Sequence, residues 1–307
     1  MRSGTPKHLS LVMALTCPLL VAHDASSCGG QLRVFGVYAS DLDDLRGLPR
    51  AARSARLHEM GVTRDDWLPD FRKAVQRYVA MCDGLEERDS SVLMRAIYGA
   101  MLVELLGEPD AADDLRRMAG VRDPVGGSLT YSALLALDAL GTEQAFLLSM
   151  LDHPHPETVQ VAILTLGVHD DAAIARTIER VGQTRQSDPQ VGEAISFIKF
   201  YQDNLAQYSK LSVLDEKIRF VEQRLSSAYV ALFDGTSWWD PYTGGDPLAR
   251  WAMARWADFS REAASRVAAA IQRVRYHENA EIAAGYRQFL TNLADPEVKK
   301  HLPADGK

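Results

Sequence analysis

Residues 153–182 read HPHPETVQVAILTLGVHDDAAIARTIERVG, and this stretch decides between two interpretations of the chain. Its three histidines and several carboxylates could mark a metal site. It also contains an apolar helical pattern that ends at Gly167, a short turn, and a second amphipathic helix. The first interpretation predicts a metalloprotein, and the second predicts one unit of a helical array.

The histidines do not have the spacing of a metal site. Metal-binding pairs on a helix are four residues apart, as in His-Glu-x-x-His. His153 and His155 are two residues apart around a proline, and His169 follows the far end of the helix, roughly 15–20 Å away. Asp170 and Asp171 stand where an N-cap and a first-turn carboxylate would serve the next helix. We therefore predict a helical unit here, with no metal and no cofactor.

The helical pattern recurs wherever a leucine–glycine pair ends a helix, at residues 106–107, 140–141 and 166–167. Positions seven, four and three residues before each leucine form one helical face, which comprises Gly99, Leu102, Val103; Ala133, Ala136, Leu137; and Val159, Ala162, Ile163. A fourth helix repeats the face without the glycine, at Val191, Ala194, Ile195 and Ile198. We expect these faces to be buried. Each glycine is expected to be the left-handed residue that follows its helix.

Partner helices lie beside these segments in the sequence. Residues 172–182 place Ile174, Ile178 and Val181 on one apolar face, and the loops are short and rich in Asp, Pro and Gly. Antiparallel helix pairs with such loops are the units of an α-solenoid.

The stretch from about Asp89 to Tyr201, about a third of the chain, resembles degenerate HEAT-like (armadillo-type) repeats. AILTLG and ALDALG match the Ala-x-x-x-Leu-Gly ending of the family's second helix, and SDPQV and DHPHPETV match its turn. The glycines are 34 and then 26 residues apart, which departs from the roughly 40 residues of a HEAT unit. The resemblance implies a short α-solenoid with a surface for protein partners.

Helical patterns also cover the flanking regions. Thr63 and Asp66 form a carboxylate variant of the capping box, followed by an apolar face of Trp67, Phe71, Val75 and Tyr78. Further on, one seam comprises Leu214, Ile218, Val221, Leu225, Ala228 and Leu232, and a second stripe comprises Phe259, Ala263, Val267, Ala270 and Val274. We expect the last two segments to pair as a long antiparallel hairpin that caps the solenoid. No segment alternates like a strand, so the chain is predicted to be all-α.

The loop 235–247 between these two segments is rich in aromatic residues. Trp238, Trp239 and Tyr242 could form a binding surface for a sugar or a partner helix, because exposed aromatics supply large contact areas. Alternatively, the indoles fold back onto the hairpin together with Trp251 and Trp256. The nearby His277 and Glu281 form an intrahelical pair rather than a metal site.

The N-terminus predicts export. Basic residues precede the apolar run LSLVMALTCPLLVA, and small residues follow it, as in a secretory signal over residues 1–27. The run is shorter than the roughly 20 residues of a membrane-spanning helix. Cys28 could be the acylated cysteine of a lipoprotein, although Ala25 replaces the usual leucine. Ordinary cleavage after Ser27 is the alternative, and Cys28 could then pair with Cys82.

These observations define the predicted organisation. A signal peptide (1–27) precedes an N-terminal extension (28–62), a HEAT-like α-solenoid (63–205) and a helical hairpin (206–307). The net charge of −7 argues against nucleic acid as a partner, and no catalytic motif is present. We therefore expect an exported, periplasmic or envelope-associated protein that binds or scaffolds an unknown protein partner without catalysis. The alternatives are a carbohydrate or small-ligand binder that uses the aromatic loop, and an enzyme with an unrecognised helical active site.

Overall fold

The structure is a computed structural model that describes residues 33–122, 128–233, 247–274 and 280–303. Over these ranges the backbone forms helices, turns and a single bridge between Val34 and Val37, but no strand. The predicted all-α class is confirmed. None of the helices in these ranges has the length and apolar character needed to cross a membrane.

The first part of the chain forms ten α-helices and two short 3-10 turns within the described residues. They are α1 (Ala39–Gly47), α2 (Arg50–Glu59), α3 (Arg64–Cys82), α4 (Ser90–Leu106), η2 (Pro109–Ala111), α5 (Ala112–Gly120), α6 (Ser128–Leu140), α7 (Gln144–Ser149), η3 (Met150–Asp152), α8 (Pro156–Leu166), α9 (Ala172–Thr184) and α10 (Pro189–Ser209).

Four of these helices pack in sequence order as one row. Helix α4 contacts α6, α6 contacts α8, and α8 contacts α10, while α3, α5 and α9 pack against α4, α6 and α10 respectively. The faces predicted from the leucine–glycine alignment are buried, except that Ile195 is half-buried. The predicted apolar faces of α3 and α9 are buried as well. That these pairs are HEAT-like repeats remains a prediction.

The three helix-ending glycines do not share one role. Gly107 and Gly141 have φ of 70° and 72°, the left-handed conformation that was predicted. The same prediction is wrong for Gly167, whose φ is −69°. A Cβ at Gly167 would lie 2.7 Å from Ile198 Cγ1 and 2.8 Å from the carbonyl oxygen of Ile163. Gly167 is therefore required by the close approach of α8 to α10, and not by backbone conformation.

The second part of the chain forms its own hydrophobic cluster. Its helices are α11 (Leu214–Phe233), α12 (Pro247–Glu262), α13 (Ala264–Arg273), α14 (Ala280–Asn292) and α15 (Pro296–Lys299). Helix α11 packs against α12 and α13 through Ile218, Val221 and Leu225. The prediction of a hairpin of two long helices is wrong for its second segment, which is divided into shorter helices. Ala263, at φ −146° and ψ 51°, separates α12 from α13.

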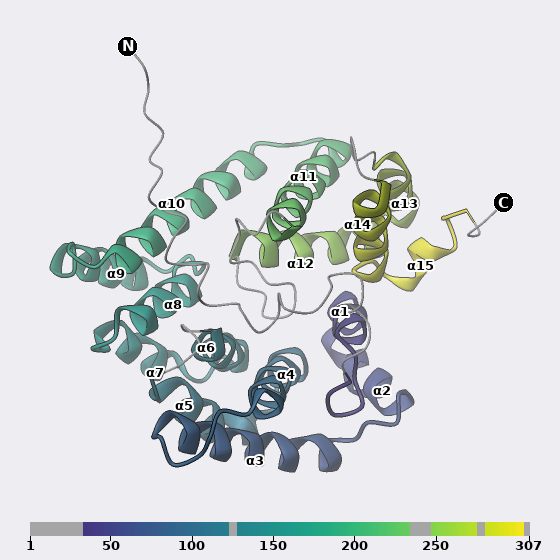
Figure 1. Ribbon diagram of the computed structural model, residues 1–307. Helices are drawn as coiled ribbons and strands as arrows, with labels where there is room; N and C mark the ends of the chain where they lie inside the picture. Colours follow the sequence, from purple (N-terminus) through teal and green to yellow (C-terminus); the bar gives the residue numbers. More distant parts are fainter. Residues whose placement is uncertain (1–32, 123–127, 234–246, 275–279, 304–307) are drawn as a thin grey trace.

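Helix α1 packs against helices of the second part, so that the described helices follow one another around a closed ring (Figure 1). Helix α1 contacts α2 and α4 on one side and α12 and α14 on the other. A Cβ at Gly47 would lie 3.1 Å from the carbonyl oxygen of Leu293, and Arg261 Nη1 donates to the Gly47 carbonyl at 3.0 Å. The region predicted as an N-terminal extension thus belongs, from Val34 onward, to the first hydrophobic cluster.

Candidate functional site

The aromatic and N-terminal candidates are not covered by the structure. Trp238, Trp239 and Tyr242 lie outside the described residues, as do Cys28 and the pair His277 and Glu281. The proposed partner of Cys28, Cys82, is half-buried in the last turn of α3.

The two tryptophans that follow the aromatic loop pack within the second part of the chain. Trp256 is fully buried, and its Nε1 donates to the Leu290 carbonyl at 3.0 Å. The half-buried ring of Trp251 makes an edge contact with Tyr208, at 4.9 Å between ring centroids. Both indoles therefore serve packing.

The histidines of the opening stretch lie at opposite ends of α8. The ring centroids of His153 and His155 are 5.3 Å apart in the turn before the helix. His169 follows the other end of the helix, and its Nε2 lies 2.7 Å from Oδ1 of Asp138 in α6. The predicted carboxylate cap of α9 is present one residue later than expected, at Asp171, which accepts hydrogen bonds from the backbone N–H groups of residues 173 and 174. Among the described residues, no group of three potential ligands is placed to hold a metal ion.

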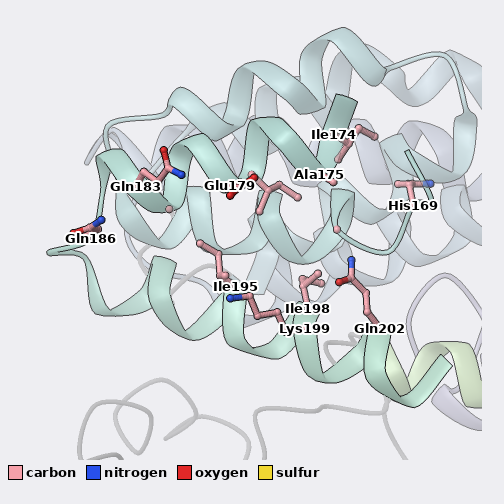
Figure 2. Close-up of a pocket in the computed structure, with 13 residues that line it drawn as sticks. His169, Ile174, Ala175, Glu179, Gln183, Gln186, Ile195, Ile198, Lys199 and Gln202 are labelled. Carbon is pink, nitrogen blue, oxygen red and sulfur yellow. The ribbon is translucent and has the colours of Figure 1, made fainter. Parts of the chain in front are cut away.

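A groove between α9 and α10 is a candidate site (Figure 2). The two helices run in opposite directions and enclose a space of about 430 Å³. Ile174 and Ile178 of α9, with Ile195 and Ile198 of α10, form its apolar floor. The exposed rim comprises Ala175, Glu179 and Gln183 on one side and Lys199 and Gln202 on the other.

Two glycines set the shape of this groove. A Cβ at Gly182 would lie 2.5 Å from Ile195 Cδ1, and Gly167 contacts Ile198 at the other end. Of these two glycines only Gly182 brings α9 against α10, whereas Gly167 brings the end of α8 against α10, and both line the groove. Ile195 borders this space, which explains why it is only half-buried.

A second, acidic hollow adjoins the groove and shares His169 and Ile174 with it. Its volume is about 320 Å³, and its lining includes four carboxylates but no lysine or arginine: Asp138, Glu143, Asp170 and Asp171. The hydrogen bond that His169 donates to Asp138 raises the pKa of His169, against the effect of burial, and the charges of Asp138 and Asp171 raise it further. Glu143 is paired with Arg116.

The lining residues are suited to binding. The isoleucine floor can bury apolar side chains, and the amide and charged groups of the rim can form hydrogen bonds. His169 and Asp138 form an imidazole–carboxylate pair, but the residues that line either hollow include no serine, threonine, tyrosine or cysteine for this pair to activate.

A separate polar cluster closes the ring between α4 and α12. Arg250 Nη2 donates to Glu104 Oε1 at 2.6 Å, and the side chains are 28% and 16% exposed. Burial opposes both charges, but their mutual attraction keeps the pKa of Glu104 below and that of Arg250 above its usual value. Arg46 and Arg53 also lower the pKa of Glu104. This pair joins two helices, so we interpret it as structural.

Sequence reasoning missed the groove, because no motif marks it. Its floor residues had been assigned to the buried faces of α9 and α10. Comparison of the chain with protein-family models, with curated proteins and with solved structures finds no match.

Proposed function

We propose that this chain is a non-enzymatic protein-binding module that holds an apolar helical segment of a partner in the groove between α9 and α10. The observation that carries the proposal is the open isoleucine floor between two helices whose rims are polar. Grooves of this kind accept amphipathic helices through apolar residues at positions i, i+3, i+4 and i+7.

A helix suits this groove better than an extended segment. The walls are two α-helices whose backbone groups are already bonded within each helix. An extended segment would find no backbone partners there and would leave its own amide groups unsatisfied over the apolar floor. A helix bonds its own backbone internally, so only side chains need to fit.

The proposed setting is the cell envelope. This part of the proposal rests on the N-terminal sequence, in which basic residues, an apolar run and small residues precede Cys28. Intact mass of the protein recovered from its host tests it. A chain that begins at or near Cys28 supports export, and an unprocessed chain that begins at Met1 contradicts it.

The binding proposal is tested by selecting ligands from a library of displayed random peptides and measuring their affinity by fluorescence anisotropy. Ala175→Trp fills the groove from its exposed rim. Ala173→Trp is the matched control, because residues two apart on a helix point in nearly opposite directions. The selected peptide should lose about tenfold or more in affinity for Ala175→Trp and bind Ala173→Trp like the original protein.

Gln202→Trp, on the opposite rim, provides a second blocking variant. Circular dichroism establishes that each variant keeps its helical content. Peptides that bind both blocking variants as tightly as the original protein would contradict the proposed role of the groove.

A further inference from the structure

The acidic hollow adjoins one end of the groove. Both are lined by His169 and Ile174, and in Figure 2 His169 marks the end of the groove near the start of α9. An occupant that lies along the isoleucine floor and extends past His169 would meet the carboxylates of the hollow.

The hollow carries excess negative charge. Asp138 faces His169, and Glu143 faces Arg116, so each of these carboxylates has one partner. Asp171 accepts hydrogen bonds only from the backbone at the start of α9, where the helix dipole offsets about half a charge. Asp170 is exposed and forms no hydrogen bond or ion pair with another described residue. The local charge favours a cationic partner.

The apolar floor and the acidic end together specify the chemistry of the occupant. Resting on the proposed function of the groove, we infer that the partner segment is an amphipathic helix with lysine or arginine side chains clustered at the end that lies over the acidic hollow. The apolar face supplies the buried area, and the basic end sets the direction in which the helix lies. Arginine suits these carboxylates because its guanidinium group can bond two oxygens at once.

The length of the groove defines the probe. Helix α9 has 13 residues, about 20 Å of helix, so a peptide of about four turns covers it. The probe has leucine at the spacing of one helical face and three arginines at one end. Two matched peptides carry glutamine or glutamate in place of the arginines. Affinities are measured by fluorescence anisotropy with the full chain.

Two protein variants test separately whether the groove binds the helix and whether the acidic hollow binds its basic end. Asp170→Asn with Asp171→Asn removes charge from the hollow but retains a capping side chain at the start of α9. This double variant should weaken binding of the arginine peptide about three- to tenfold and leave the glutamine peptide unchanged. Ala175→Trp should weaken binding of both peptides about tenfold. The glutamate peptide should bind more weakly than either.

Three results would overturn the inference. If the arginine and glutamine peptides bind equally well and both are blocked by Ala175→Trp, the basic end is wrong and the groove retains its proposed function. If neither peptide binds, or if Ala175→Trp has no effect, the proposed function itself fails. If the protein is a dimer that Ala175→Trp dissociates, the occupant is a second copy of the chain.

Discussion

Replacement of Gly167 by alanine tests the packing that shapes the groove. Gly167 has φ of −69° and ψ of −8°, so an alanine meets no conformational penalty there. Its Cβ would lie 2.7 Å from Ile198 Cγ1 and 2.8 Å from the Ile163 carbonyl oxygen. The carbonyl belongs to the backbone of α8 and cannot move away without disturbing the helix. We therefore expect Gly167→Ala to lower the free energy of unfolding.

The expected magnitude follows from two opposing effects. Overpacking a buried contact costs about 1–3 kcal/mol. Loss of glycine's freedom in the unfolded chain offsets about 0.4–1 kcal/mol of this. The central values, about 2 and about 0.7 kcal/mol, leave a net destabilisation of about 1.3 kcal/mol. Gly192, in the first turns of α10, is the matched control, because a Cβ there meets no atom within 4 Å. Gly192→Ala should stabilise the protein by about 0.5–1 kcal/mol.

The assay is urea denaturation of both variants, followed by circular dichroism. Hydrogen exchange of α8 and α10 locates the change, since the two hydrophobic clusters need not unfold together. If Gly167→Ala is as stable as the original protein while Gly192→Ala gains stability as expected, α8 and α10 do not approach each other as described.

Three further predictions follow from the capping and ionic contacts. Asp171→Ala removes the cap of α9 and should cost about 1 kcal/mol in urea denaturation, whereas an asparagine at this position should cost much less. Glu104 has a lowered pKa in the folded protein, so its pair with Arg250 stabilises the fold above the usual glutamate pKa of 4.5. This stabilisation is lost as the pH falls through the pKa of Glu104 in the folded protein. In Glu104→Gln, the free energy of unfolding should therefore fall less steeply as the solution is acidified. His169 has a raised pKa, so its pair with Asp138 stabilises the fold below the usual histidine pKa of 6.5 and the effect is lost as the pH rises through the folded value. Titration by NMR should show a lower pKa for His169 in Asp138→Asn, and an unchanged pKa would refute this pairing.

Much of the fold could be predicted from periodicity. The apolar faces of the row of helices depend on local spacing, and the structure buries all of them apart from Ile195. The helix caps at Thr63 and Asp171 could also be predicted from local sequence, because each cap joins a side chain to a backbone N–H group only two or three residues away.

Contacts between distant segments could not be predicted in this way. The break at Ala263 has no proline or glycine to signal it, and it accompanies the packing of α13 and α15 against each other and against α12. The closure of the ring depends on the packing of Gly47 against the Leu293 carbonyl and on the ion pair between Arg250 and Glu104. Neither pair shares a local pattern in the sequence.

The groove was missed for a similar reason. An apolar face at helical spacing predicts burial, but it does not reveal how far apart two packed helices lie. Gly182 was not recognised as a contact point, although a glycine inside an amphipathic helix often marks a close approach. The spacing between α9 and α10 thus emerges only from the tertiary structure.

Hydrogen exchange of the full chain, with and without a peptide selected for binding, tests the central claim most directly. The account predicts that bound peptide slows exchange in α9 and in the segment 195–202 of α10, with little change elsewhere. Slower exchange confined to residues 235–247 would instead assign binding to the aromatic loop and contradict the role proposed for the groove.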